Sequence, residues 1–271
     1  RTVALFGIDG SVRLVDARTG SELRTLAGHT QMVHDSAWSA DGKRLATCGT
    51  DSTVRVWDVA TGLPLASLPS EEEYSCSAAV SPDGAWVAAG GSEDGAVKVF
   101  RVQDGLKVHG FRTEESRIPA LVFSPDGKHL LAAQSDGGTI RVVRIEDAKE
   151  IAVKPLPGGV RNSARMAFSR DGRRMALSSV EGPILILDTA TWSEIRRLEG
   201  HPQGSAQVVF HPGGRAVASI GQRDGGPGAG TLRLWDVQTG RLLREPAADL
   251  PPESRMAFSP DGRTLVVVGE G

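Results

Sequence analysis

Two sets of side chains in the sequence have the types that nucleophilic catalysis requires. Each set combines a histidine, a hydroxyl residue and an aspartate, and in a hydrolase the histidine would take the proton of the hydroxyl group. The sets are His29, Thr47, Asp51 and His201, Ser219, Asp224. The same side chains can instead form a buried structural network, and both sets fall at matching positions of an internal repeat, which favours the structural role. We therefore expect no catalytic residue and no enzymatic activity.

The internal repeat is marked by two motifs that recur with one period. The first is a Ser-Pro-Asp-Gly-like turn and the second is a Val-Arg-Val-Trp-Asp-like strand, and each recurs at intervals of 42 to 48 residues. The turns end at Gly42, Gly84, Gly127, Gly172, Gly214 and Gly262. The strands end at Asp16, Asp58, Arg101, Arg144, Asp188 and Asp236. Two independent motifs that share one period indicate a repeat architecture.

Each repeat has the pattern of four short strands. An apolar run precedes the turn, in which glycine is expected to supply the positive φ. A β-rich run such as 44–49, a tight turn at Asp51, the strand ending at Asp58 and a fourth run such as 63–68 follow. The first run carries small apolar residues on both sides, as in a strand buried on both faces. No sustained helical period is present. The sequence predicts an all-β protein whose four-stranded sheets are the blades of a β-propeller.

Dipeptides within the repeats carry a family resemblance. The pairs Gly28-His29 and Gly200-His201, followed by Trp57-Asp58 and Trp235-Asp236, resemble the WD-repeat β-propeller family, and the recurrent Ser-Pro-Asp-Gly turns are similar to those of bacterial arrays. The resemblance covers essentially the whole chain and implies buried tetrads. The implied tetrads are His29, Thr47, Asp51, Trp57 and His201, Ser219, Asp224, Trp235. Elsewhere the tryptophan is replaced by Val15, Phe100, Val143 and Leu187, and we expect packing alone to hold those blades.

The ends of the chain determine the expected number of blades. Residues 1–7 and 266–271 align with second strands, so the chain should hold three strands, five complete blades and two further strands. We predict seven blade positions with incomplete first and last blades, with six blades as the alternative. Residues 1–271 are interpreted as a single WD-repeat β-propeller domain that is a segment of a longer chain.

Composition excludes several classes of protein. The 31 basic and 33 acidic side chains give a net charge of −2, which argues against a nucleic-acid partner. The longest apolar runs have four to six residues, too few to cross a membrane. Cys48 and Cys76 are the only cysteines, too few for a disulfide framework or a cysteine-based zinc site. We expect a monomeric, cytoplasmic protein without a cofactor.

A propeller metalloenzyme would need similar ligands at equivalent positions of several blades. The relevant first-strand position holds Asp35, Ser77, Ala120, Arg165, Gln207 and Arg255. One carboxylate and two arginines at this position cannot form a metal site. A propeller-type hydrolase or lactonase is therefore the less favoured alternative for the function. A basic residue also recurs at Arg13, Arg55, Lys98, Arg141 and Arg233. Pairing with acids and packing over apolar surface are favoured there over a polyanion-binding belt.

The resemblance implies recognition of proteins or peptides by the loops that enter the first strand. By register, the partner-binding candidates are Met32, Tyr74, Arg117, Asn162, Thr50, Glu93 and Arg223. Tyrosine and arginine dominate interface energetics and methionine adapts its shape, although an ordinary solvated loop is the alternative. Trp192 replaces a turn glycine and is either a packing residue between blades or an exposed contact.

The function expected from these features is that of a non-catalytic scaffold, which presents a rigid propeller face to partner proteins or peptides. An alternative is the sensor or scaffold arm of a larger bacterial signalling protein, such as a serine/threonine kinase fusion. Kinase motifs in the flanking sequence would distinguish the two.

Overall fold

The computed structural model describes most of the chain. The described residues are 2–70, 76–91, 95–112, 118, 120–134, 138–155, 165–178, 182–201, 205–222, 230–246, 250–251 and 254–269. Every helix or strand assigned in this part is a β-strand, and there are twenty-five of them. Within these ranges no helix is long and apolar enough to cross a membrane.

The chain divides into two compact units. The first comprises Arg1–Gln134 and Arg141–Val153, and the second comprises Ser135–Ile140 and Lys154–Gly271. Each unit is built from sheets in which every strand is hydrogen-bonded to the next strand along the chain. The strands are short and joined by tight turns, and each turn brings one strand directly beside the next. Consecutive strands therefore pair in a meander.

The first unit holds four sheets, apart from a few residues of the last one. One sheet has three strands: β1 (Thr2–Phe6), β2 (Val12–Asp16) and β3 (Glu22–Leu26). The next has four: β4 (Val33–Trp38), β5 (Arg44–Gly49), β6 (Thr53–Asp58) and β7 (Pro64–Pro69). It is followed by β8 (Cys76–Val80), β9 (Trp86–Gly91), β10 (Ala96–Arg101) and β11 (Lys107–Arg112). The fourth sheet is β12 (Ala120–Phe123), β13 (His129–Gln134), β14 (Thr139–Arg144) and β15 (Glu150–Pro155).

The second unit holds three sheets. The first is β16 (Arg165–Phe168), β17 (Arg174–Ser178), β18 (Ile184–Asp188) and β19 (Glu194–Leu198). The second is β20 (Ser205–Phe210), β21 (Ala216–Gln222), β22 (Gly230–Asp236) and β23 (Leu242–Arg244). The third has two strands, β24 (Arg255–Phe258) and β25 (Leu265–Val268).

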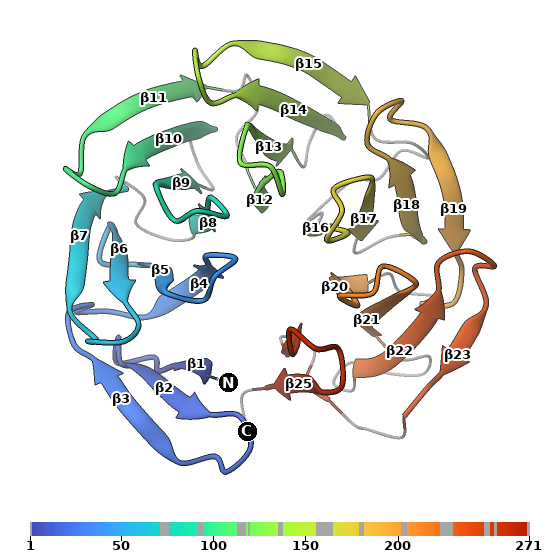
Figure 1. Ribbon diagram of the computed structural model, residues 1–271, viewed down its shortest axis with the longest axis horizontal. Helices are drawn as coiled ribbons and strands as arrows, with labels where there is room; N and C mark the ends of the chain where they lie inside the picture. Colours follow the sequence, from blue (N-terminus) through green and yellow to red (C-terminus); the bar gives the residue numbers. More distant parts are fainter. Residues whose placement is uncertain are drawn as a thin grey trace. The chain divides into compact units, whose positions relative to one another are not determined.

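These sheets confirm the prediction of an all-β propeller of four-stranded blades. Three strands, five complete sheets and two strands follow one another as expected (Figure 1). Six of the sheets have three or four strands, which supports the alternative count of six blades. Assignment of residues 1–271 to a single domain stays a prediction.

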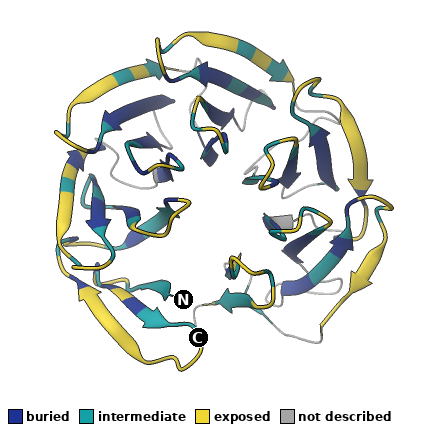
Figure 2. Ribbon diagram, viewed as in Figure 1, coloured by how far each residue is buried: buried dark blue, intermediate teal, exposed yellow. Residues whose placement is uncertain are grey.

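Apolar side chains between neighbouring sheets form the core of each unit. In the first unit, Ala46, Val56, Ala78, Val87 and Phe100 belong to one cluster that joins the β4–β7 sheet to the β8–β11 sheet. In the second unit, a cluster that includes Ile186, Phe210 and Trp235 joins β16–β19 to β20–β23 in the same way. Figure 2 shows the consequence: the second and third strands of the four-stranded sheets are largely buried, and their fourth strands are exposed over most of their length.

The first strands differ in burial from the expectation. All four residues described for β8 are buried and β12 is mostly buried, but β4 and β16 are largely half-buried. A first strand is the free edge of its sheet, so small side chains there leave part of the edge open to solvent. Cys48 is fully buried in β5 and is disulfide-bonded, so the chain has no free cysteine among its described residues.

The Ser-Pro-Asp-Gly turns have the predicted backbone. Their six glycines all have φ between 69° and 71°. In the first of these turns the Ser39 hydroxyl donates to Asp41 at 2.7 Å, and Arg44 N–H donates to Ser39 Oγ at 2.9 Å. The next turn repeats this arrangement with Ser81 and Asp83. The side chains therefore close the turn and link it to the second strand.

A second turn, between the third and fourth strands, also requires a left-handed residue. This position holds glycine in four repeats, namely Gly20, Gly62, Gly105 and Gly240. Ala148 and Trp192 hold it in the other two, with φ of 55° and 60°. A side chain in this region costs about 1–2 kcal/mol relative to the right-handed helical region. Two repeats therefore carry backbone strain that the other four avoid.

The outer strands share a bulge. In five sheets the pairing between the outer two strands shifts by one residue, and the extra residue is always aliphatic and exposed. These residues are Leu23, Leu65, Val108, Ile195 and Leu243. A bulge interrupts the regular alternation of a strand and increases its twist.

Candidate functional site

The first predicted tetrad is assembled in the β4–β7 sheet. The indole N–H of Trp57 donates to Thr47 Oγ1 at 2.8 Å, and Thr47 Oγ1 lies 2.8 Å from His29 Nε2. On the other side of the ring, His29 Nδ1 lies 2.8 Å from Asp51 Oδ2. Strands β5 and β6 supply Thr47 and Trp57, the turn between them supplies Asp51, and the loop before β4 supplies His29. Four side chains from separate segments thus form one chain of hydrogen bonds.

When His29 is neutral, the hydrogen bonds of this network can run in only one direction. Trp57 can only donate, so Thr47 accepts from it and directs its own hydroxyl hydrogen to His29 Nε2. The hydrogen of the imidazole is then on Nδ1, where it donates to Asp51. Thr47 and Trp57 are fully buried and His29 is buried. The hydroxyl group therefore has no access to a substrate, which argues against the nucleophile interpretation.

Burial and the surrounding groups shift the pKa values of His29 and Asp51. Desolvation lowers the pKa of His29, although hydrogen bonding and charge attraction from Asp51 oppose this effect. Desolvation alone would raise the pKa of Asp51, but hydrogen bonds from Thr53, His29 and Thr30 outweigh it and lower that pKa. Near neutral pH the pair is therefore a neutral imidazole beside an ionised carboxylate.

The tetrad holds together the two loops that carry the described partner-binding candidates. Thr30 N–H donates to Asp51 Oδ2 at 3.1 Å, and Thr50 N–H donates to the carbonyl of Met32 at 2.9 Å. Met32 and Thr50 are both half-buried. Because each loop bonds to the other as well as to the tetrad, their relative positions within the sheet are fixed by buried contacts.

Gly28 explains why a glycine precedes the histidine of this tetrad. A Cβ atom at Gly28 would lie 2.6 Å from Arg55 Nη1 and 2.8 Å from Trp57 Cη2. Any larger residue would displace the tryptophan ring or the arginine. The Gly-His pair is therefore required by packing.

The second set is formed in part among the described residues. His201 Nε2 lies 2.7 Å from Ser219 Oγ, which also accepts from the indole N–H of Trp235 at 2.7 Å. Asp224 lies outside the described residues, and within the described part His201 Nδ1 has no hydrogen-bond partner. Burial, together with the nearby Arg233 guanidinium, lowers the pKa of His201 to about 4.

The repeats without the tryptophan fill the equivalent position with apolar side chains. Phe100, Val143 and Leu187 are buried, and Val15 is half-buried. Hydrogen bonds between sheets supplement this packing. Arg24 donates to the carbonyls of Thr61 and Ala60 in the following sheet, both at 2.8 Å. In the second unit Arg196 donates to Gln238 in the following sheet at 2.9 Å. The expectation that packing alone holds the blades without the tryptophan is therefore incomplete, because long arginine side chains also reach the turns of the neighbouring sheet.

The other five partner-binding candidates lie outside the described residues, in contrast to Met32 and Thr50. They are Tyr74, Glu93, Arg117, Asn162 and Arg223. The structure brings together only Met32 and Thr50 from that set. Trp192 is half-buried, and its backbone N–H donates to the carbonyl of Asp188 at 2.8 Å.

Two of the recurrent basic residues pair with acids, and a third bonds to a backbone carbonyl. Arg141 lies 2.7 Å from Glu150, and Arg233 lies 2.7 Å from Glu245. Lys98 is buried, and its ammonium group donates to the carbonyl of Ser70 at 2.9 Å. These contacts favour the structural interpretation of the basic positions over a polyanion-binding belt. Within the described ranges no group of three or more His, Cys, Asp or Glu side chains could hold a metal ion.

The polar residues at this first-strand position have a role that the sequence did not predict, which is to accept hydrogen bonds from the next sheet. Asp35 Oδ2 accepts a hydrogen bond from Ala78 N–H, Ser77 Oγ accepts from Leu121 N–H, and Gln207 Oε1 accepts from Met256 N–H, each at 3.2 Å. In each case the acceptor belongs to one sheet and the N–H to the edge strand of the next. The sequence signal for this role is the recurrence of a hydrogen-bond acceptor at this register in Asp35, Ser77 and Gln207.

Comparisons with known proteins agree with this geometry. Residues 20–58 match the family model described as "WD domain, G-beta repeat", and residues 81–156 match the "Anaphase-promoting complex subunit 4 WD40 domain". An uncharacterized WD repeat-containing protein of Synechocystis is 27% identical over 107 residues, which cover 40% of this chain and 29% of that protein. The meiotic recombination protein rec14 of Schizosaccharomyces pombe is 29% identical over 103 residues, which cover 38% of this chain and 32% of that protein.

The chain thus spans about a third of the length of either relative. Propellers of this kind generally mediate protein interactions and are generally not catalytic. The shared period, the sheets, the hydrogen-bonded tetrad, the two family models and the cyanobacterial relative together support assignment of the chain to the WD-repeat β-propeller family.

Proposed function

We propose that the chain is a non-catalytic scaffold that binds a protein or peptide partner through the loops next to its first strands. The observation that supports this most directly is the coupling of the Met32 loop to the Thr50 turn through the tetrad. A surface held in one conformation before binding loses little entropy when the partner arrives. The tetrad therefore stabilises the fold and preorganises the surface beside it.

The proposed surface also includes the equivalent positions of other repeats. By register these are Tyr74, Arg117, Asn162, Glu93 and Arg223. Equivalent positions of neighbouring repeats within one unit face the same way, so a partner could contact several repeats of that unit at once. The sequence beside Tyr74 and Arg117 is acidic, with Glu71 to Glu73 and Glu114-Glu115, so a partner with basic and apolar character would complement it.

Site-specific crosslinking tests this proposal. A photoreactive amino acid replaces Met32, and in a second variant it replaces Leu65, which is exposed on β7. A partner crosslinked from Met32 and not from Leu65 supports the proposed surface. The variants Tyr74→Ala and Arg117→Ala should then weaken binding strongly, as truncated hot-spot residues do, whereas Arg55→Ala should not. If binding is lost with Arg55→Ala alone, the partner contacts a different surface.

The link to a larger signalling protein is tested by the sequence on either side of this segment. A kinase glycine-rich loop with its lysine and catalytic-loop aspartate in the same reading frame would support it. If the flanking sequence lacks such motifs, the kinase-fusion alternative is wrong and the scaffold function stands on its own.

A further inference from the structure

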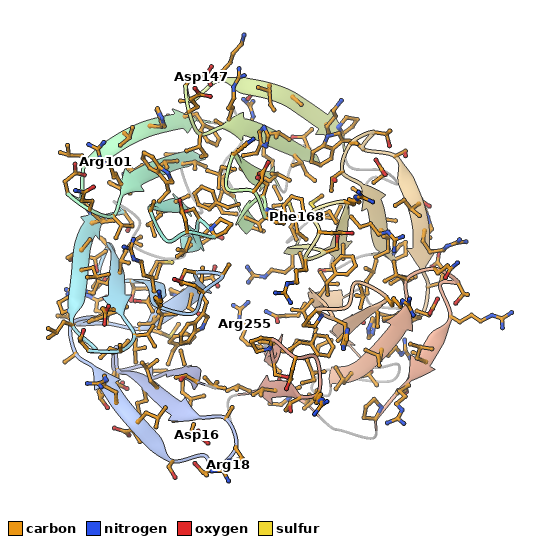
Figure 3. All side chains as sticks on the ribbon, viewed as in Figure 1. Asp16, Arg18, Arg101, Asp147, Phe168 and Arg255 are labelled. Carbon is orange, nitrogen blue, oxygen red and sulfur yellow. The ribbon has the colours of Figure 1, made fainter. Side chains whose placement is uncertain are left out.

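Arg55 of β6 contains a buried polar atom without a hydrogen-bond partner. The residue is half-buried, and its Nε atom is buried and unpaired within the part of the chain that the structure describes. Other arginines of the first unit have acidic partners. Arg101 lies 2.7 Å from Asp104, and Arg144 lies 3.0 Å from Asp147; Arg101 and Asp147 are labelled in Figure 3. A buried donor without an acceptor is unfavourable, so the Nε atom of Arg55 calls for an explanation.

The sheet with the second tetrad shows which group pairs with this atom. Arg233 holds the position of Arg55 in β22, and its Nε donates to Glu245 Oε2 at 2.7 Å. Both guanidinium groups lie over the glycine of a Gly-His pair. A Cβ atom at Gly28 would lie 2.6 Å from Arg55 Nη1, and one at Gly200 would lie 3.1 Å from Arg233 Nη1. The two arginines therefore occupy the same place in their sheets, but only the second has a carboxylate partner among the described residues.

Ser67 lies opposite Arg55 in the position that a glutamate holds in the other sheet. The pairing of β6 with β7 places Ser67 directly opposite Arg55. The pairing of β22 with β23 continues by one residue to Glu245, which therefore lies opposite Arg233. Directly opposite residues have Cβ atoms about 4.5–5.5 Å apart, within reach of a long side chain. A negative charge on Ser67 would therefore take the place of the glutamate.

Ser67 lies on the same face of its sheet as Arg55 and is open to solvent. The residues that alternate with them, Val54, Val56 and Leu68, pack in the core cluster on the other face. Ser67 is exposed, and no hydrogen bond of its hydroxyl group is found among the described residues. Its strand, β7, is the last one of the sheet, so no further strand of that sheet lies beside it. An enzyme can therefore reach the hydroxyl group while the sheet stays folded.

The β1–β3 sheet has a hydroxyl residue at the same register but not the other features. Thr25 pairs with Arg13, but its hydroxyl group donates to Glu22 at 2.7 Å, and Arg13 is exposed. A second negative charge at Thr25 would be repelled by the Glu22 carboxylate. Thr25 is therefore a matched control for Ser67.

We propose that Ser67 is a phosphorylation site whose phosphate pairs with the guanidinium group of Arg55. A protein kinase transfers the terminal phosphoryl group of a nucleoside triphosphate to Ser67 Oγ. The new O–P bond forms as the bond to the departing nucleoside diphosphate breaks, and the hydroxyl proton passes to a base of the kinase. A phosphate beside an arginine makes charge-assisted hydrogen bonds. Because the Nε atom of Arg55 is buried, a group on the adjacent strand reaches it more easily than a carboxylate of a partner protein does.

The pairing is tested on the whole chain with phosphoserine incorporated at position 67. Phosphorus NMR follows the titration of the phosphate, whose second pKa is about 6 when no cation is near. The Arg55 guanidinium favours the doubly charged form, so the pKa of the phosphate should be lowered, and Arg55→Gln should restore the ordinary value. Phosphothreonine at position 25 should show no lowering of its pKa. Equal pKa values at position 67 with and without Arg55 would overturn the pairing.

The modification itself is tested with an extract of the cells that produce the chain. The parent chain, Ser67→Ala and Thr25→Ala are each incubated with radiolabelled ATP, Mg²⁺ and the extract. Ser67→Ala should take up less label than the other two chains, and peptide mapping of the parent should place phosphate on Ser67. Equal labelling of the parent and Ser67→Ala, including no label in either, would overturn the assignment of Ser67. Ser67→Ala should keep the urea midpoint of the parent chain, which shows that a loss of label does not come from unfolding.

Discussion

Asp35 of β4 accepts the backbone N–H of Ala78 in β8, the edge strand of the next sheet, at 3.2 Å. The Ser77 hydroxyl lies 3.4 Å from the same carboxylate oxygen. An edge strand has N–H groups that no strand of its own sheet can accept, and a carboxylate from the neighbouring sheet satisfies one of them. Asp35 therefore acts as a link between two sheets.

Replacing Asp35 by alanine should lower the free energy of unfolding by about 1–3 kcal/mol, because Ala78 N–H would stay buried without an acceptor. Asp35→Asn keeps an acceptor oxygen and should cost less. Urea denaturation gives both values, and hydrogen exchange of the Ala78 amide should accelerate only in the alanine variant. Equal costs for the two variants would show that the charge matters and the acceptor does not.

Trp57 and Phe100 occupy equivalent positions in neighbouring sheets and separate packing from hydrogen bonding. Both are buried, but only Trp57 donates to a tetrad hydroxyl. Trp57→Ala should cost about 3–5 kcal/mol from lost packing together with the broken network. Phe100→Ala should cost a similar packing contribution without the polar penalty. If the urea midpoint is unchanged in Trp57→Ala, the structural role of the tetrad is wrong.

Stability should decrease as the pH falls below neutral. His201 has a pKa of about 4 in the folded chain, below its value of 6.5 in an unfolded one, so the unfolded state binds the proton more tightly. The stabilisation is complete above about pH 6.5 and is lost as the pH falls towards about 4. The lowered pKa values of His29 and Asp51 act in the same direction.

The His201 contribution amounts to about 3 kcal/mol, since each unit of pKa difference corresponds to about 1.4 kcal/mol. Urea midpoints measured between neutral pH and the mid-acid range should therefore fall steeply for the parent chain. The fall should be shallower for His201→Gln, which has no proton to bind. Parallel curves for the two chains would contradict the assignment.

The left-handed turn position predicts opposite effects for two substitutions. Ala148 has φ of 55° and Gly105 has φ of 69° at equivalent places. Ala148→Gly removes a strained Cβ and should stabilise the chain by a fraction of the about 1–2 kcal/mol of strain, because glycine also gains freedom in the unfolded state. Gly105→Ala introduces the strain and should destabilise by about 1 kcal/mol. Thermal midpoints check both, and a gain from Gly105→Ala would argue against strain at this position.

Elemental analysis of the washed, purified chain should find no stoichiometric metal, and lactone and ester substrates should not be hydrolysed. The physical reason is that the first-strand position offers one carboxylate, Asp35, beside two arginines. Stoichiometric calcium or zinc would contradict the non-enzymatic interpretation.

The sequence repeat predicts the structure within one repeat well, but it does not predict the contacts between repeats. Turn glycines such as Gly42 could be predicted because a tight turn depends on a few adjacent residues. The pairing of Asp35 with Ala78 could not, since it joins residues 43 positions apart across two sheets whose relative register is set by packing. The burial of Lys98 was missed for the same reason, because its acceptor, the carbonyl of Ser70, lies directly after β7 of another sheet. Candidates such as Tyr74 and Arg117 stay predictions, as they lie outside the described residues.

The bulges at Leu23 and Leu65 also limit how far each sheet can grow. The bulge at Leu65 lies next to the first residue of β7, so a strand from another molecule that paired with Pro64 would be one residue out of register along the rest of β7. The prolines at the two ends of β7, Pro64 and Pro69, donate no hydrogen bond to such a strand. Edge-to-edge aggregation of these sheets is therefore opposed by backbone geometry, even though aliphatic side chains are exposed along the same strands.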